Sequence, residues 1–416
     1  MRLFLLLSAA TAVLFSPLRK SIRADDWPQW RGPHRDGVAT EKGLLDSWPE
    51  AGPPLLWKVS GRGGGYSSPA IVKGTIYGTG YRKGEEVVWA LSASDGSEIW
   101  NSPTADVAAA YSDIEYPEGP RATPTVDGDR LYVLGTAGQL SCLERATGKV
   151  VWARNLTSEM GGEVMSDWGY SEAPLVMGDR LFCTPGGARG ALAALNKMTG
   201  EVLWRSKDFQ DPAAYTSLVS AEISGRKQVV VLTGASVAGI DPESGETLWQ
   251  VERKGKIAVV PTPIVQDDLV WVTSGYGVGS HLFKISETDG KFAAKQVYAS
   301  KKLKNEFGGA VRVGDYVYAS SGVVFVCMDF KTGEVVWRER SIGSGGLLYA
   351  DGHFYLRNDR GILALIEANP KAYVEKGQFE QSDRGENKTW PTPVIVDGKL
   401  YLRDQDKLLC YDVRKK

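Results

Sequence analysis

The chain has 416 residues, and its 49 Lys and Arg nearly balance its 50 Asp and Glu. This balance excludes the strongly basic surface that nucleic-acid binding proteins need. The 48 glycines, 13 tryptophans and 17 tyrosines are typical of an all-β protein with tight turns and large aromatic side chains.

Residues 1–24 are predicted to be a secretory signal peptide. The uncharged run Leu3 to Phe15 is too short to span a bilayer, and Ala24 is a candidate cleavage point. Basic residues follow this run, which leaves an uncleaved membrane anchor as the alternative. We therefore expect export to the periplasm or the extracellular space, with membrane contact only through an uncleaved signal.

Residues 25–54 are predicted to form an N-terminal arm. Two stretches of this arm are rich in aromatic residues and proline, residues 27–33 and residues 43–49. We expect the arm to pack its aromatic side chains on the rest of the protein. The alternative is that Trp27 and Trp30 bind a peptide or a sugar.

A Gly-x-x-x-Trp motif recurs along the chain after strand-like runs, at an interval of about 45 to 50 residues or twice that. Its copies are Gly96 to Trp100, Gly148 to Trp152, Gly200 to Trp204, Gly245 to Trp249 and Gly333 to Trp337. Two further repeats lack the tryptophan, having Ala294 and Tyr373 in its place. Such an interval indicates a repeat architecture.

Each repeat divides into four short strands. In the second repeat these strands are expected at residues 122–126, 130–134, 139–143 and 149–152, with Asp-Gly and Thr-Gly turns among them. Four hairpin-linked strands of this kind are typical of one blade of a β-propeller.

The openings of the first strands indicate eight blades: Ser68-Pro69, Thr123-Pro124, Ala173-Pro174, Ser217-Leu218, Thr262-Pro263, Gly309-Ala310, Gly345-Gly346 and Thr392-Pro393. The eighth repeat ends after its third strand, residues 407–413. The strand-like residues 55–59 lie before the first repeat and resemble the missing fourth strand. We therefore predict that they close the ring, with Trp57 near Leu409, because closure removes exposed sheet edges. Residues 55–416 then form one propeller domain.

The repeat tryptophans are predicted to be structural and to dock one blade against the next: Trp57, Trp100, Trp152, Trp204, Trp249 and Trp337. Cys142, Cys327 and Cys410 share one repeat position, which calls for a small buried side chain. Equivalent positions in separate blades are too far apart for a disulfide, so we expect no disulfide framework.

The segment Ala194 to Trp204 resembles the tryptophan-docking motif of the PQQ-like propeller repeat, as do residues 142–152, 239–249 and 327–337. The resemblance covers about residues 55 to 416 and implies an eight-bladed propeller. Two well-known groups share this repeat: the quinoprotein alcohol dehydrogenases and the lipoprotein propeller of the outer-membrane protein assembly machinery. The two aromatic stretches of the arm, residues 27–33 and 43–49, also resemble the start of exported bacterial PQQ-like repeat proteins of unassigned role.

Neither well-known group matches in its functional residues. Quinoprotein dehydrogenases use adjacent cysteines, an acidic base and a calcium ion, but this chain has no Cys-Cys pair and its residues do not map onto the calcium ligands. The first cysteine is Cys142, so the lipidated cysteine of the assembly lipoprotein is absent. The three histidines have no metal-ligand spacing. We expect no metal and no cofactor, and PQQ with calcium is the alternative.

One mouth of the propeller channel is the expected binding place. Residues just before the inner strands are predicted to line it: Tyr66, Arg121, Tyr170, Glu172, Tyr215, Phe307 and Trp390. Aromatic rings with one Arg and one Glu can hold a flat ligand, a carboxylate-bearing quinone or a peptide. The alternative is that these side chains plug the channel and hydrogen-bond to one another.

Two long connections, residues 101–121 and 153–172, are expected to enter the same mouth. Between them they contain Asp106, Asp113, Glu115, Glu118, Glu159, Glu163, Asp167 and Glu172. Such an acidic rim would attract a cation or a basic partner, and the alternative is that these are solvated loops.

The leading hypothesis is a monomeric, non-enzymatic binding or scaffolding protein of the cell envelope, with an envelope protein or a small ligand at the channel mouth. The second hypothesis is a PQQ-dependent oxidoreductase acting on alcohols or sugars. In that case Arg121 would pair with quinone carboxylates, Trp390 or Tyr66 would stack on the ring, and Glu172 would hold calcium or act as base. A third is a polysaccharide-recognition module. No catalytic residue is assigned.

Overall fold

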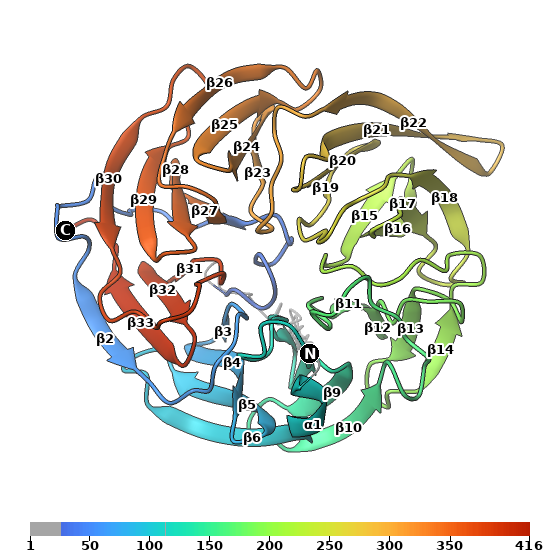
Figure 1. Ribbon diagram of the computed structural model, residues 1–416, viewed down its shortest axis with the longest axis horizontal. Helices are drawn as coiled ribbons and strands as arrows, with labels where there is room; N and C mark the ends of the chain where they lie inside the picture. The colour runs from blue at the N-terminus through green and yellow to red at the C-terminus, as the bar shows by residue number, and fades with distance from the viewer. Residues whose placement is uncertain (1–25, 113) are drawn as a thin grey trace, which may run out of the picture.

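The computed structural model describes residues 26–112 and 114–416. The predicted signal peptide, residues 1–24, lies outside this part of the chain. Eight sheets surround a central channel, and each contains four antiparallel strands of the repeat (Figure 1). The predicted eight-bladed all-β propeller is therefore confirmed. In the described ranges, no helix is both long enough and apolar enough to cross a membrane.

The blades are numbered in chain order, with the first strand of each beside the channel. Blades 1 to 4 contain β3 (Ala70–Val72), β4 (Thr75–Arg82), β5 (Glu85–Ser92), β6 (Glu98–Asp106); β7 (Thr125–Asp127), β8 (Arg130–Leu134), β9 (Gln139–Glu144), β10 (Val150–Asn155); β11 (Leu175–Met177), β12 (Arg180–Cys183), β13 (Ala193–Asn196), β14 (Val202–Arg205); and β15 (Val219–Ile223), β16 (Arg226–Leu232), β17 (Ser236–Ile240), β18 (Thr247–Glu252).

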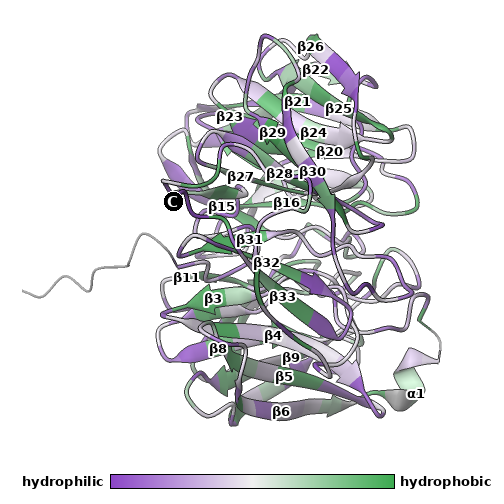
Figure 2. Ribbon diagram, turned by 90° about the vertical axis from the view of Figure 1, so that its left-hand side faces the viewer, coloured by the Kyte–Doolittle hydropathy of each residue, from purple (hydrophilic) through white to green (hydrophobic). Residues whose placement is uncertain are grey.

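Blades 5 to 8 contain β19 (Ile264–Gln266), β20 (Leu269–Ser274), β21 (Gly279–Thr288), β22 (Lys291–Ser300); β23 (Val311–Val313), β24 (Tyr316–Ser321), β25 (Val324–Asp329), β26 (Val335–Arg340); β27 (Gly345–Ala350), β28 (His353–Asn358), β29 (Ile362–Glu367), β30 (Glu375–Glu380); and β31 (Val394–Val396), β32 (Lys399–Asp404), β33 (Lys407–Asp412), β2 (Leu55–Val59). The short helix α1 (Ala108–Tyr111) follows blade 1 and projects from one face of the ring (Figure 2).

The middle strands of each blade are buried on both faces. β8 and β20, for example, are buried along almost their whole length because neighbouring blades cover both sides. Their sequences therefore read as nearly continuous apolar runs rather than as alternating ones. The outer strands are only partly covered, as the pattern of β14 shows. The core consequently lies between the blades, in clusters that each pair of neighbours shares.

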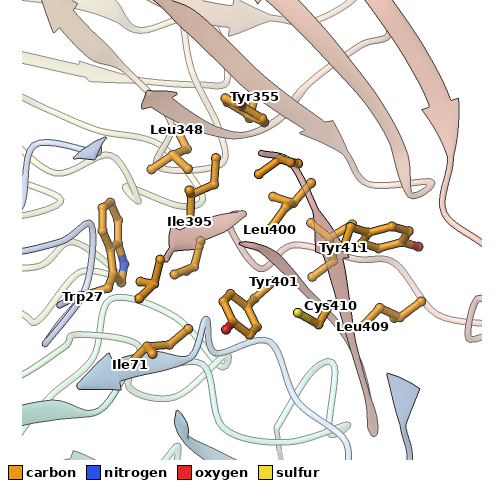
Figure 3. Close-up of a cluster of buried hydrophobic side chains, with 14 of the residues drawn as sticks. Trp27, Ile71, Leu348, Tyr355, Ile395, Leu400, Tyr401, Leu409, Cys410 and Tyr411 are labelled. Carbon is orange, nitrogen blue, oxygen red and sulfur yellow. The ribbon is translucent and has the colours of Figure 1, made fainter. Parts of the chain in front are cut away.

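The ring closes as the sequence predicts. β2 pairs antiparallel with β33, and Trp57 lies opposite Cys410 while Lys58 lies opposite Leu409. Behind this pair, apolar side chains of blades 7, 8 and 1 form one buried cluster (Figure 3). The first strand of the propeller is thus held by the last, and no blade is left with three strands.

Most repeat tryptophans contact the glycine turn of the next blade. A Cβ atom on Gly148 would lie 2.4 Å from the Trp100 ring, and the Trp100 indole donates a hydrogen bond to the Arg145 carbonyl at 3.1 Å. Trp152, Trp204 and Trp337 donate to carbonyls of the next blade in the same way, and Trp57 lies against Gly96. These glycines have positive φ, which a side chain would strain.

Blades 4 and 5 depart from this pattern. Trp249 donates to Gln228 Oε1 of its own blade at 2.7 Å, although its ring is buried in the cluster between the two blades. In blade 5 a long hairpin moves the docking position beyond Ala294, and Tyr298 occupies it. The Tyr298 hydroxyl donates to the Phe330 carbonyl at 3.0 Å, and its ring contacts Gly333.

The N-terminal arm fills the central channel. Trp27 exchanges backbone hydrogen bonds of 2.7 and 2.8 Å with Ile71 of β3, and the Pro28 carbonyl accepts from Val126 of β7. Farther along the arm, β1 (Val38–Ala39) pairs in parallel with β27 and gives blade 7 a fifth strand. The arm therefore joins inner strands of blades 1, 2 and 7 (Figure 1).

Arg31 fixes the arm to blade 6. Its Nη1 donates to the Gly308 carbonyl at 2.6 Å, and its Nη2 donates to the Ala310 carbonyl at 2.5 Å. The side chain is buried, and burial lowers its pKa to about 10, while Asp36 opposes this shift. The guanidinium is still charged at neutral pH.

Arg35 fixes the arm to blades 3 and 4. Its Nη1 donates to the carbonyls of Ala173 and Leu218, each at 3.0 Å, and its Nη2 donates to the Pro174 carbonyl at 2.5 Å. Burial also lowers the pKa of Arg35 to about 10, with Glu172 acting in the opposite direction. Both arginines therefore satisfy carbonyls at the start of inner strands, which face the channel and have no partner strand on that side.

Glu172 lies inside blade 3, close to Arg35, and only 2% of its surface is exposed. Its Oε2 accepts a hydrogen bond from the Thr184 backbone at 2.9 Å, while its Oε1 has no partner within the described chain. Burial raises the pKa of Glu172 to about 7, and Thr184 and Arg35 offset only part of this shift. The carboxyl group is thus about half protonated at neutral pH.

We predict that Gly148→Ala destabilises the fold more than Gly128→Ala. Both glycines have positive φ, but a Cβ at 148 meets the Trp100 ring, whereas a Cβ at 128 meets nothing within 4 Å. The backbone strain of about 1 kcal/mol is shared, so the difference reports the contact with Trp100. Denaturant unfolding should give a loss at least about 2 kcal/mol larger for Gly148→Ala. Equal losses would show that the tryptophan does not dock there.

We also predict that ionisation of Glu172 destabilises the fold. The folded-state pKa of about 7 lies above the unfolded value of about 4.3. The stability that the protonated carboxyl group contributes is therefore fully present below pH 4.3 and is lost as the pH rises through 7. Relative to wild type, Glu172→Gln should therefore gain about 3 kcal/mol in free energy of unfolding between pH 4 and pH 8.

Chemical denaturation across this pH range tests the prediction. Glu163→Gln makes the same chemical change at an exposed position of the same connection and serves as the matched control. Parallel curves for wild type and Glu172→Gln would contradict the assignment.

Candidate functional site

A cavity of about 250 Å³ lies at one mouth of the channel, and we call it the mouth cavity. Its walls come from the segments before the inner strands of seven blades, from the β20–β21 hairpin and from the arm. The lining residues are Trp30, Tyr66, Tyr116, Arg121, Trp168, Ser171, Tyr215, Ser217, Ala258, Val260, Tyr276, Glu306, Phe307, Lys388 and Trp390. Eight of these fifteen are aromatic, which makes the cavity mainly an apolar site.

Trp30 brings the arm into the wall of the cavity. Its indole Nε1 donates to Thr262 Oγ1 of blade 5 at 2.9 Å, and its ring lies beside Gly308. Trp30 precedes Arg31, so the contacts that fix the arm in the channel also fix this ring. The arm thus closes the channel next to the mouth cavity.

The aromatic rings of the wall contact one another. The Tyr66 and Trp390 rings are tilted by 30° with centroids 4.3 Å apart, and Trp168 and Tyr215 are stacked at 5.4 Å. Tyr116 stands edge-on to both pairs, 5.2 Å from Trp390 and 5.7 Å from Trp168. Through Tyr116 of the connection between blades 1 and 2, these four contacts join blades 8, 1, 3 and 4 into a continuous aromatic surface.

The connection between blades 1 and 2 presents Tyr116 and Arg121. It is held by Tyr111 of α1, whose hydroxyl donates to Glu86 Oε1 at 2.6 Å and lies 3.0 Å from Thr136 Oγ1. Burial raises the pKa of Glu86, and the hydrogen bonds from Tyr111 and Thr136 partly oppose this. A buried anchor of this kind gives the connection a fixed conformation.

Arg121 has one satisfied end and one free end. Its Nη2 donates to the carbonyls of Glu115 and Tyr116, each at 2.9 Å, while its Nη1 is buried without a partner within the described residues. The guanidinium carbon lies 5.7 Å from the Tyr66 ring centroid, within the range of a cation–π contact. Burial lowers the pKa of Arg121.

The cavity has three charged lining residues. Arg121 and Lys388 are basic, and Lys388 is exposed with Asp359 at 3.6 Å. Glu306 comes from blade 6 and lies near Tyr276, whose pKa is raised by burial and then by Glu306. The carboxylate of Glu115 accepts a hydrogen bond from the Trp168 indole at 2.5 Å and is therefore engaged with the wall.

The structure brings together five of the seven predicted mouth residues: Tyr66, Arg121, Tyr215, Phe307 and Trp390. Tyr170 instead points into the core, where its hydroxyl donates to the Pro185 carbonyl at 2.8 Å, and Glu172 is buried beside the arm. Both lie next to Ser171, which does line the cavity. The rule that mouth residues come just before an inner strand therefore finds the right segment of the chain. Which residues of that segment face the channel depends on the direction of each side chain.

The remaining lining residues were not predicted. Tyr116 and Trp168 lie in the two long connections that the sequence assigns to this mouth, so the unusual length of these connections was the signal that could have identified them. None of the described members of the acidic rim expected there lines the cavity. Glu172 is buried, Glu159 lies 3.9 Å from Arg154, and the side chains of Asp106 and Asp113 lie outside the described part of the structure.

The chain is similar to proteins of one propeller superfamily. The family described as outer membrane protein assembly factor BamB matches residues 83–280 and 244–373. The assembly factor BamB of Shewanella oneidensis is 23% identical over 306 residues, which covers 67% of this chain and 74% of that protein. A quinoprotein ethanol dehydrogenase of Pseudomonas putida is 25% identical over 147 residues, covering 32% of this chain and 23% of that enzyme.

Solved structures share the fold. BamB from Moraxella catarrhalis superposes with a TM-score of 0.58 at 14% identity, covering 86% of this chain and 99% of that one. Quinohemoprotein alcohol dehydrogenase from Comamonas testosteroni gives 0.57 at 13% identity, covering 96% and 82%. The family match spans more than half of the chain, so this protein belongs to the family of PQQ-like β-propellers described as outer membrane protein assembly factor BamB.

Proposed function

We propose that this chain is a binding or scaffolding protein of the cell envelope that holds a partner or ligand at the mouth cavity and uses no cofactor. The observation that supports it best is the arm in the channel. It leaves a cavity at the mouth that is walled by aromatic rings and, among the described residues, carries a single lining carboxylate, Glu306. Such a surface is suited to holding a ligand or a partner's side chain.

The envelope location rests on the relatives and on the sequence. Relatives that cover two thirds of this chain are named outer membrane protein assembly factors, and residues 1–24 read as an export signal. We therefore place the chain outside the cytoplasm, where an envelope protein would be its partner.

The second candidate is a PQQ-dependent oxidoreductase. It is favoured by the fold of the quinoprotein dehydrogenases and by Arg121, which could pair with a carboxylate of the quinone. The donor set fits poorly, however. Calcium takes six to eight oxygen ligands, and within the described residues no group of three or more His, Cys, Asp or Glu side chains could hold a metal ion. Glu172, the carboxylate assigned to calcium, is buried away from the cavity.

The polysaccharide hypothesis is also less well supported. Sugar recognition on a propeller face would use an exposed aromatic platform. Here Tyr66 and Tyr215 are buried, and Tyr116, Trp168 and Trp390 are partly buried against other rings. The rings face a small cavity rather than an open surface.

We predict that Tyr276→Asn abolishes partner capture. Tyr276 has a φ of 54°, a conformation that Asn adopts readily, so the substitution removes the ring and leaves the hairpin intact. Loss of a buried aromatic contact should lower retention of the envelope partner at least about tenfold. Asp267→Asn is the control, since it places the same residue at a positive φ in an exposed turn of the same blade, outside the cavity.

The measurement compares proteins retained from an envelope extract by immobilised wild type and the two variants. Identical capture by Tyr276→Asn and wild type would contradict a role for the mouth cavity. A parallel calorimetric titration with PQQ should give no heat that depends on Ca²⁺. Tight one-to-one binding of PQQ that requires Ca²⁺ and is lost in Arg121→Ala would instead favour the oxidoreductase.

A further inference from the structure

Two hydrogen-bond donors in the wall of the mouth cavity are buried and unused. Within the described chain, neither Arg121 Nη1 nor Trp390 Nε1 has a partner. A buried donor without an acceptor costs about 1–3 kcal/mol, and most buried polar groups in proteins are satisfied. Both donors belong to residues that line one cavity, so acceptors on a bound ligand would satisfy them together.

Both donors belong to residues that pack on the same ring. The guanidinium of Arg121 lies 5.7 Å from the Tyr66 centroid, and the indole of Trp390 lies 4.3 Å from it. Since Nη2 of Arg121 is held by two backbone carbonyls, the orientation of Nη1 is fixed. The donors are therefore preorganised around Tyr66 before any ligand binds.

The charges on this side of the cavity favour an anion. Arg121 is cationic, and Lys388 lies two residues before Trp390 on the same segment. The nearby carboxylate of Glu115 accepts a hydrogen bond from Trp168. Beside the larger effect of burial, Glu118 acts to raise the pKa of both Tyr66 and Arg121, and its Oε2 is buried without a partner among the described residues. Glu306 is the one carboxylate among the described lining residues and comes from blade 6.

The rest of the cavity favours a flat apolar group. Trp30, Trp168, Tyr215 and Phe307 line the space, and aromatic walls bind planar rings by stacking and edge contacts. The volume of about 250 Å³ is below the range of about 300–1,000 Å³ for drug-sized ligands. The occupant is thus a small molecule rather than a long chain.

We propose that the mouth cavity binds a small aromatic carboxylate, with the carboxylate on Arg121 Nη1 and Trp390 Nε1 and the ring among the aromatic walls. This inference rests on the proposed binding function of the mouth. It adds the chemical class of the ligand. Paired donors on a guanidinium and an indole suit two carboxylate oxygens, and the charge-assisted bond from Arg121 is the stronger of the two.

Calorimetric titration of the full chain with 2-naphthoate and with its neutral amide, 2-naphthamide, tests this proposal. The carboxylate should bind one-to-one and at least about ten times more tightly than the amide. Arg121→Gln should weaken 2-naphthoate by about 10- to 100-fold while changing 2-naphthamide less than about threefold. Arg360→Gln is the matched control because Arg360 is exposed and lies outside the cavity.

A second variant keeps the test decisive if Arg121→Gln disturbs its connection. Trp390→Phe retains an aromatic ring but removes Nε1, so it should weaken 2-naphthoate about three- to tenfold and leave the amide unaffected. Equal affinity for the two probes, or no heat with 2-naphthoate at millimolar concentration, would overturn the proposal. Tighter binding of tetramethylammonium than of 2-naphthoate would overturn it too, since that would make the site a cation cage.

The two experiments distinguish a wrong ligand class from a wrong role of the mouth cavity in partner binding. If 2-naphthoate does not bind but Tyr276→Asn still abolishes partner capture, the ligand class is wrong and the mouth remains a protein-binding site. If 2-naphthoate binds and Tyr276→Asn captures the same proteins as wild type, the cavity is a small-molecule site and its role in partner binding is wrong.

Discussion

The fold depends on how the inner edges of its blades are satisfied. Each inner strand has a neighbour on its outer side only, so its other edge turns unpaired backbone groups toward the channel. Arg31 and Arg35 supply donors to five of these carbonyls from blades 3, 4 and 6, and the backbone of the arm serves blades 1, 2 and 7. The burial of two cations is offset because nearly all of their acceptors are backbone carbonyls, the exception being Gln29 Oε1, which accepts from Arg35.

The same arrangement shapes the candidate site. Trp30 adjoins Arg31, so the residue that closes the cavity is positioned by the contact that fixes the arm. Glu172 is buried in blade 3 near the arm, where burial raises its pKa to about 7 and the Arg35 guanidinium partly opposes this shift. Ligand binding and the integrity of the channel therefore share residues of the arm, and a change in one is expected to affect the other.

The sequence predicted the ring more completely than the site. A local repeat predicts the eight inner strands, the closing strand and the docking of Trp100 and Trp152. Its turn residues and strand spacing can be recognised within a single copy of the sequence repeat. Tyr298 was missed because an extended hairpin displaces the docking position by several residues. The arm in the channel could not be predicted, since its arginines bind backbone carbonyls, which leave no pattern in the side chains of their partners.

For the site, the segments were predicted but the directions of their side chains were not. Tyr170 and Ser171 are adjacent, and only Ser171 faces the cavity, because a one-residue change in an extended segment reverses the side chain. Trp168 and Tyr116 reach the cavity through irregular connections, which have no period to follow. Long-range contacts such as Tyr66 with Trp390 emerge only when blades 8 and 1 are joined.

The measurement that tests this account most directly is the free energy of unfolding of Arg35→Met. The substitution keeps an unbranched apolar chain but leaves the carbonyls of blades 3 and 4 without donors, so we predict a loss of at least about 3 kcal/mol. Arg82→Met, at an exposed arginine of β4, should cost less than about 0.5 kcal/mol. Equal stability of the two variants would contradict the claim that the arm holds the blades together.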